Sequence, residues 1–222
     1  QNTNLTLIVQ PKNSGPSAAR NRAISEVKNG WIAILDADDY MDPDRLRKML
    51  DVGVNEQLDM VADDLVRVPA IPQPASGTRL WADQAIGLVR MDAGMFALEN
   101  LNARTGSRRE LGYLKPIIRT EFLTTNAISY NEDMRLSEDY DIYMRCLLAG
   151  ARFGLIDPCG YFSVDYPNSL SKEFASADLR RGLDRDREYL TQPGLTADAI
   201  QSISRHKMQA YKHWAWMHLI ER

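Results

Sequence analysis

Three carboxylates lie close together directly after a short apolar run. Residues 31–35 read Trp-Ile-Ala-Ile-Leu, and Asp36, Asp38 and Asp39 follow. A short apolar run with branched residues predicts a buried strand, and open α/β sheets bind ligands where their strands end. Three neighbouring negative charges repel one another unless a cation or a charged partner relieves them. These oxygen ligands suit Mg²⁺ or Mn²⁺ shared with the phosphates of a substrate.

A structural role competes with metal binding at this turn. Aspartates are common turn and cap residues, and we expect Asp42 to cap a helix that has Pro43 at its first position. From this stretch alone the two interpretations have equal weight. A calcium-binding EF-hand loop is excluded, because it would place Met41 where a glycine belongs and Arg47 where the last glutamate belongs.

A second acidic cluster begins a predicted helix over residues 137–149. Ser137 is the expected N-cap, and Glu138, Asp139 and Asp141 fall in the first turn. Acids at a helix N-terminus are explained by the backbone dipole alone, and the pattern by itself favours this structural role. The functional alternative is that one carboxylate projects into a cleft and acts as a general base toward a hydroxyl nucleophile.

Strands and helices alternate over the first part of the chain, which predicts a layered α/β domain with parallel strands. The strand patterns cover residues 5–9, 31–35, 59–68 (broken near residues 63–64), a short piece within 111–118, 152–156 and 161–166. The helix patterns cover residues 16–28, 43–54, 120–124, 137–149, 175–190 and 196–222.

Composition excludes several classes of protein. The 222 residues carry a net charge of -3, which argues against a general nucleic-acid binder. The two cysteines form no metal-ligand pattern, so a reducing, cytosolic location is expected. No apolar run approaches the length of a membrane span. Because the chain enters a predicted strand directly after Gln1, without a methionine, we expect it to be a fragment of a longer protein.

Four stretches, in their order and spacing across about residues 5–173, resemble the family 2 glycosyltransferases, which are inverting enzymes of the GT-A fold. They are the Asn-Ser-Gly-Pro-Ser-Ala-Ala-Arg-Asn of residues 13–21, the Ile-Leu-Asp-Ala-Asp-Asp-Tyr of residues 34–40, residues 112–123 and residues 137–153. The resemblance implies an α/β fold of GT-A type, with a mixed, mainly parallel sheet flanked by helices. It also implies a donor half over residues 1–68, an acceptor half over 69–173 and a C-terminal helical extension over 174–222.

The resemblance implies roles for individual residues. Asp139 would be the catalytic base, with Glu138 as the second candidate. Asp38 would hold Mn²⁺ or Mg²⁺ against the diphosphate of a UDP-sugar. The other implied donor-binding residues are Asp36, at the nucleotide, Asp39, through water or by orienting the turn, Arg20, near the nucleotide, and Ser169 and Lys172, at the diphosphate.

The sequence departs from the family pattern at Tyr166, where many relatives have a histidine that some use as a metal ligand. The three histidines, His206, His213 and His218, occur only in the last predicted helix. Apolar residues, tryptophans and basic residues share that helix, which favours packing on the domain or on a second copy. The alternative is contact with a membrane surface, which would place the protein at the inner face of the membrane.

Three functions remain open at this point. The leading one is transfer of a sugar from a nucleotide sugar to a saccharide or lipid-linked saccharide acceptor in polysaccharide biosynthesis. A sugar-phosphate nucleotidyltransferase shares the general fold, although the acidic helix at residue 138 argues against it. A non-catalytic nucleotide- or glycan-binding module is the third.

Overall fold

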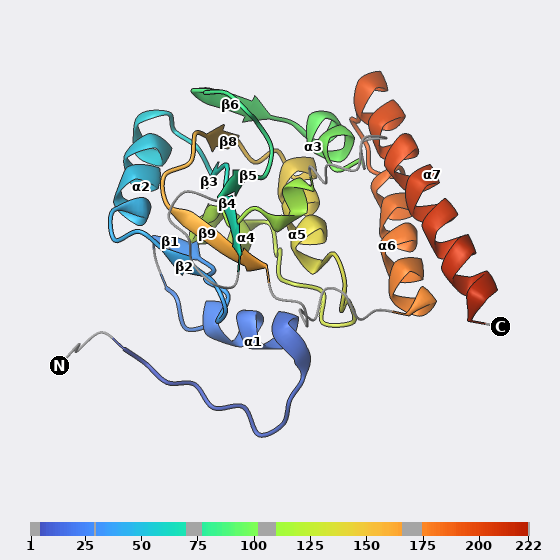
Figure 1. Cartoon of the computed structure of the whole chain (residues 1–222), viewed down its shortest axis with the longest axis horizontal. Helices are drawn as coiled ribbons and strands as arrows, with labels where there is room; N and C mark the ends of the chain where they lie inside the picture. The colour runs from blue at the N-terminus through green and yellow to red at the C-terminus, as the bar shows by residue number, and fades with distance from the viewer. Residues whose placement is uncertain (1–4, 29, 70–76, 102–109, 166–174, 222) are drawn as a thin grey trace.

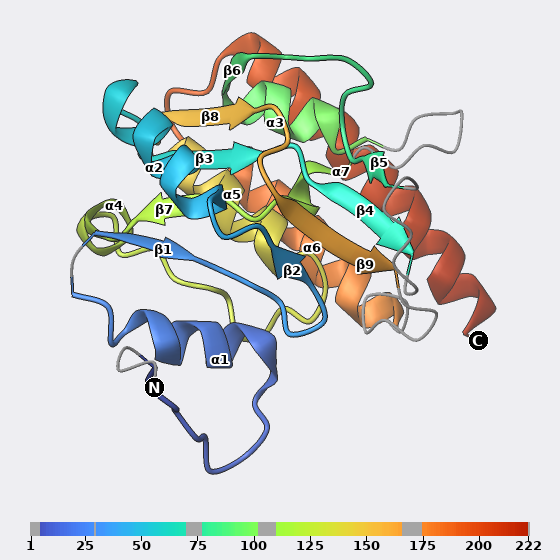
Figure 2. The same cartoon turned by 60° about the vertical axis from the view of Figure 1, so that its left-hand side comes forward.

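The computed structural model describes residues 5–28, 30–69, 77–101, 110–165 and 175–221. Its strands form two sheets, and Figures 1 and 2 show helices on both sides of the larger one. The larger sheet has the order β1 (Trp31–Ala33), β7 (Ile117–Arg119), β3 (Met60–Asp63), β8 (Phe153–Ile156) and β6 (Leu88–Met91). The smaller has the order β2 (Tyr40–Met41), β9 (Tyr161–Asp165), β4 (Val66–Pro69) and β5 (Thr78–Arg79).

The helices bury both faces of the larger sheet. Strand β3 is buried along its whole length, and its side chains alternate between two apolar clusters. Met60 and Ala62 belong to the cluster that contains residues of α3 (Ala93–Glu99) and α5 (Glu138–Leu148). Val61 packs with Met49 of α2 (Arg45–Asn55) on the opposite face. The remaining helices are α1 (Gly15–Ile24), the 3-10 turn η1 (Leu111–Tyr113), α4 (Thr120–Thr125), α6 (Ser176–Tyr189) and α7 (Ala197–Ile220).

The mixed sheets flanked by helices confirm the predicted fold class, but parallel pairing is rarer than expected. Among the described strands, only β3 with β8 and β4 with β9 run parallel. Strand β7 lies antiparallel between β1 and β3, so β1 is an edge strand rather than a central parallel one. Short buried strands look alike in sequence whichever way their neighbours run.

The helices predicted at residues 120–124, 137–149, 175–190 and 196–222 are confirmed within one or two residues, except that Arg222 lies outside the described residues. The predicted break near residues 63–64 is also confirmed, because β3 ends at Asp63 and β4 begins at Val66 in the other sheet.

Three local predictions are wrong. The helix predicted over residues 16–28 ends at Ile24. Residues 5–9 form no strand, because they pair with no described strand and leave Leu5, Leu7 and Val9 exposed. Asp42 is not a helix cap, since α2 begins at Arg45 and has Asp44 at its N-cap. The backbone N–H of Asp42 instead donates to the carbonyl of Gly160, so this residue belongs to the turn beside β2.

The C-terminal helices pack on the domain. Helix α7 lies along α6 and α3 (Figure 1), and its outer side leaves Met208, Trp216 and Leu219 exposed. Within the described residues, none of the helices is both long and apolar enough to cross a bilayer. Contact of α7 with a membrane surface or a second copy stays a prediction, as does the division into a donor half, an acceptor half and a helical extension.

A fully buried ion pair joins several of these elements. The carboxylate of Asp63 in β3 accepts from Arg45 Nε at 3.0 Å and Nη2 at 2.7 Å, and neither side chain reaches solvent. The other oxygen of Asp63 accepts from the backbone N–H groups of Cys159 at 3.0 Å and Tyr161 at 3.3 Å. Arg45 Nη2 also donates to the carbonyl of Lys115 at 2.6 Å. The pair therefore fixes α2, the entry to β7 and the start of β9 around β3.

Removing one partner of this pair tests its role. Arg45→Met leaves the Asp63 carboxylate buried without its cation, so we expect a loss of about 3–5 kcal/mol in the free energy of unfolding, measured by chemical denaturation. The control Arg47→Met removes an exposed arginine of the same helix and should change stability by less than about 0.5 kcal/mol. Equal stability of the two variants would show that the buried pair does not organise the fold.

Candidate active site

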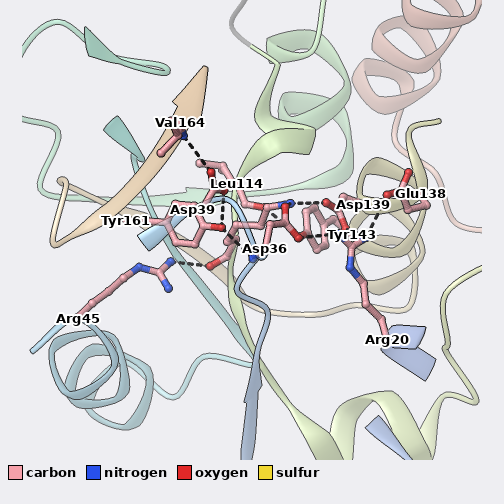
Figure 3. A network of polar contacts seen from close by, with 11 residues as sticks. Arg20, Asp36, Asp39, Arg45, Leu114, Glu138, Asp139, Tyr143, Tyr161 and Val164 are labelled. Atoms are coloured by element: carbon pink, nitrogen blue, oxygen red, sulfur yellow. Dashed lines mark hydrogen bonds and ion pairs between the residues drawn. The ribbon is translucent and has the colours of Figure 1, made fainter. Parts of the chain in front are cut away.

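The three aspartates after β1 have different surroundings. Asp36 is half-buried, and Asp38 is exposed and makes no hydrogen bond or ion pair within the described part of the chain. Asp39 is held by β9, because its carboxylate accepts from Tyr161 Oη at 2.7 Å and from the backbone N–H of Val164 at 2.9 Å (Figure 3). The three carboxylates therefore have distinct roles, and only Asp38 is free to take a ligand without losing a partner among these residues.

Helix α5 carries Glu138 and Asp139 at its start. Ser137 is the N-cap, as predicted, but its side chain makes no capping bond and its φ of 62° places it in the left-handed region. A non-glycine residue in this region costs roughly 1–2 kcal/mol. The helix packs through an apolar face, with Ile142, Tyr143 and Leu147 buried and Leu148 partly buried. The apolar face thus anchors the helix while its first turn points toward the turn after β1.

Asp36 and Asp139, which are far apart in the sequence, meet around two cations. Arg20 Nη2 contacts Asp36 Oδ1 at 2.9 Å, while its Nη1 contacts Asp139 Oδ1 at 3.1 Å and Glu138 Oε1 at 3.0 Å (Figure 3). Lys115 Nζ contacts Asp139 Oδ2 at 2.6 Å and Asp36 Oδ2 at 3.0 Å. We call these five side chains the charge ring. Each of the two aspartates is held at both of its oxygens, one by each cation.

The pKa values follow from this arrangement. Burial lowers the pKa of Lys115, but the charges of Asp139 and Asp36 outweigh burial, so the pKa of Lys115 is raised. Burial raises the pKa of Asp36, but Lys115 and Arg20 outweigh it, so the pKa of Asp36 lies below its usual value. Burial and the neighbouring charge of Asp139 raise the pKa of Glu138 despite Arg20. The ring therefore keeps Asp36 ionised and favours the protonated form of Glu138 relative to a free glutamate.

Helix α1 presents Arg20 to the ring because it is docked on the loop before α5. The side chain of Asn21 exchanges two hydrogen bonds with the backbone of Tyr130, at 2.9 and 2.8 Å. The guanidinium of Arg20 lies 5.2 Å from the centre of the Tyr130 ring, which adds a cation–π contact. The structure thus brings the predicted site residues Arg20, Asp36, Glu138 and Asp139 together, and their individual roles stay predictions.

The sequence analysis missed two residues of this region. Lys115 was inside one of the quoted stretches but received no role, although a single lysine between apolar residues 114 and 117 was an available signal. Tyr161 begins β9 and supplies the hydroxyl that holds Asp39, and no local pattern marked it. Ser169 and Lys172, predicted at the diphosphate, and Tyr166, which takes the place of the family's histidine, lie outside the described residues.

The carboxylates of the turn after β1 are compatible with a divalent cation that is shared with substrate phosphates. No group of three or more histidine, cysteine, aspartate or glutamate side chains within the described residues could form a complete metal site. Mg²⁺ and similar cations are, however, often held by one or two carboxylates together with substrate phosphates and water. Asp38 offers such a carboxylate, whereas Asp36 and Asp39 already have protein partners.

The amino-acid sequence matches known proteins over most of its length. Residues 1–102 match the model of the family described as "Glycosyl transferase family 2". The chain is 35% identical over 218 residues to succinoglycan biosynthesis protein ExoU of Rhizobium meliloti (strain 1021), covering 98% of this chain and 62% of the relative. It is 27% identical over 207 residues to protein ExoO of the same organism, covering 93% of this chain and 58% of that relative. The chain thus spans about three fifths of the length of these relatives.

Solved structures share the fold. S. aureus TarS 1-349 in complex with UDP-GlcNAc matches with a TM-score of 0.68 at 16% identity, over 92% of this chain and 55% of that one. The UDP complex of the same TarS fragment matches with a TM-score of 0.65 at 18% identity, over 91% of this chain and 54% of that one. These identities support the fold alone. The structural matches show a GT-A fold, and the sequence matches show that residues 1–102 resemble glycosyl transferase family 2 and that the chain is homologous to the two succinoglycan biosynthesis proteins.

Proposed function

We propose that this protein is an inverting glycosyltransferase that moves a sugar from a UDP-sugar to a saccharide or lipid-linked saccharide acceptor in polysaccharide biosynthesis. The observation that carries the proposal is the charge ring, in which the donor-side Asp36 and the base candidate Asp139 are bridged by the same two cations. The names of the relatives support a role in polysaccharide biosynthesis, and the UDP-GlcNAc complex of a protein with the same fold supports a UDP-sugar donor.

Asp139 is the proposed base. A sugar hydroxyl is a weak nucleophile at neutral pH, so a carboxylate that accepts its proton during attack lowers the barrier. The acceptor oxygen forms a bond to the anomeric carbon while the bond from that carbon to the phosphate oxygen breaks. The proton moves to Asp139, the nucleoside diphosphate leaves, and a single displacement inverts the configuration. Glu138 is the second candidate, because its raised pKa suits proton exchange.

The donor side is assigned to the turn after β1. Asp36 would accept hydrogen bonds from the nucleoside, and Asp38 would hold Mn²⁺ or Mg²⁺ beside the diphosphate. A bound cation of this kind stabilises the negative charge that develops on the leaving diphosphate. Asp39 cannot leave Tyr161 and Val164 without losing two hydrogen bonds, so its role here is to shape the turn that presents Asp38.

The other two functions have less support. A nucleotidyltransferase has no evident use for an acid at the start of α5 that Arg20 and Lys115 bridge to Asp36. The family match over residues 1–102 also weighs against it. A non-catalytic module has no need for a carboxylate that two cations hold in place, although only turnover excludes it.

Replacement of the proposed base separates chemistry from binding. We expect Asp139→Asn to lower UDP-sugar turnover by about 10²–10⁴-fold, because the neutral amide cannot take the acceptor proton. UDP should still bind. Turnover is measured by UDP release and binding by calorimetry. The control Asp133→Asn changes an exposed aspartate of the loop before α5 and should keep wild-type activity. Full activity of Asp139→Asn would overturn the assignment of the base.

The metal assignment predicts a loss of metal dependence. In Asp38→Asn we expect the stimulation of turnover by Mn²⁺ to fall by about 10²-fold or more, because the free carboxylate beside the diphosphate is gone. UDP release is compared with Mn²⁺ and with chelator present. Asp51→Asn, on the exposed side of α2, is the matched control. The assignment is wrong if Asp38→Asn responds to Mn²⁺ as the wild type does.

A further inference from the structure

Lys115 is an unusual member of the charge ring because it reaches the ring from inside the protein. Its residue is 5% exposed, yet its ammonium group contacts two carboxylates that substrates are proposed to touch. A buried lysine loses its hydration, and this cost is tolerated only where negative partners replace water. Here the partners are Asp139 at 2.6 Å and Asp36 at 3.0 Å.

The backbone around Lys115 is held on both sides. The carbonyl of Leu114 accepts from Tyr143 Oη of α5 at 2.9 Å, and the carbonyl of Lys115 accepts from Arg45 Nη2 of α2 at 2.6 Å. Pro116 follows and restricts the backbone further. Arg45 is itself locked to Asp63. The lysine therefore extends from a short segment that is tied to helices on both faces of the sheet.

Lys115 and Arg20 contact different carboxylate oxygens of Asp36 and Asp139. Arg20 takes Oδ1 of both aspartates, and Lys115 takes Oδ2 of both. With either cation alone, each carboxylate could rotate about its last side-chain bond. With both present, the planes and the separation of the two carboxylates are set together. Each carboxylate oxygen has two lone pairs, so its contact with a cation leaves it able to accept a further hydrogen bond.

We propose that Lys115 is a positioning residue that holds the base Asp139 in register with the donor-side Asp36, so that the acceptor hydroxyl and the anomeric carbon meet in line. The inference rests on the proposed function and adds to it a residue whose role lies in orientation rather than in contact with substrate. Small errors in such alignment are costly, since a displacement of about 1 Å can reduce a rate by about 100-fold.

The test compares Lys115→Met and Lys115→Arg in the full chain with UDP-sugar and acceptor. Methionine keeps the apolar stem and removes the charge, so we expect kcat to fall about 100-fold. The Kd for UDP should change by less than about fivefold, because Arg20 still holds Asp36. Arginine restores a cation, and we expect it to recover at least about tenfold of the lost kcat. The control Lys48→Met removes an exposed lysine on α2 and should match the wild type.

A double mutant distinguishes positioning from general damage. If Lys115 acts through Asp139, adding Lys115→Met to Asp139→Asn should lower kcat by less than about threefold more, because the group to be positioned is already lost. A further loss of about 100-fold, or a wild-type kcat in Lys115→Met, would overturn the inference while leaving the proposed function intact. No turnover by the wild-type protein with any UDP-sugar would instead overturn the proposed function, and the inference with it.

A milder variant covers the case in which Lys115→Met does not fold. Tyr143→Phe removes only the hydroxyl that holds the Leu114 carbonyl and keeps the buried ring. We expect a folded protein, judged by its thermal unfolding, with kcat reduced about tenfold and UDP binding unchanged. A wild-type kcat in this variant would show that the held backbone of residues 114–115 does not position the base.

Discussion

The buried ion pair between Arg45 and Asp63 is the constraint from which the arrangement of the site follows. One end of the pair holds the Lys115 carbonyl, and the other holds the backbone of Tyr161. Those two residues then hold the carboxylates of the candidate site, since Lys115 contacts Asp36 and Asp139, and Tyr161 contacts Asp39. The guanidinium also lies 4.8 Å from the centre of the Tyr161 ring. The buried pair of Arg45 and Asp63 thus sets the spacing of side chains in the candidate site.

The two sides of the site are supported in different ways. On the donor side, the turn after β1 is fixed through β9, because Asp39 binds both Tyr161 and Val164. On the side of the base, α5 is fixed by its apolar face and by Asp141, whose carboxylate pairs with Arg145 and Arg185. Asp141 was predicted only as one of three acids in a first turn. Unlike Glu138 and Asp139, Asp141 points away from the charge ring toward α6, where it helps to pack the two helices.

Much of the fold and of the site could be predicted because the signals were local. The helix from residue 138 carried a 3.6-residue apolar period and acids at its start, and the aspartates after residue 35 followed a short apolar run. Direction of pairing was not local, so β1 could not be recognised as an edge strand. The segment at residues 5–9 had strand composition, but a strand also needs a partner. Lys115 was missed because a sequence pattern does not say where one long side chain ends, and its destination depends on residues more than 20 positions away in either direction.

The balance of charge in the ring has a consequence for how a donor is captured. Three carboxylates face two cations in the charge ring, so one negative charge is left over when all five groups are ionised. Because Arg20 and Lys115 are already paired with carboxylates, we expect these two cations to add little long-range attraction toward an anionic donor. The charge ring would therefore act on the proposed donor mainly at contact distance. We expect these five groups to make the association with such a donor depend little on ionic strength.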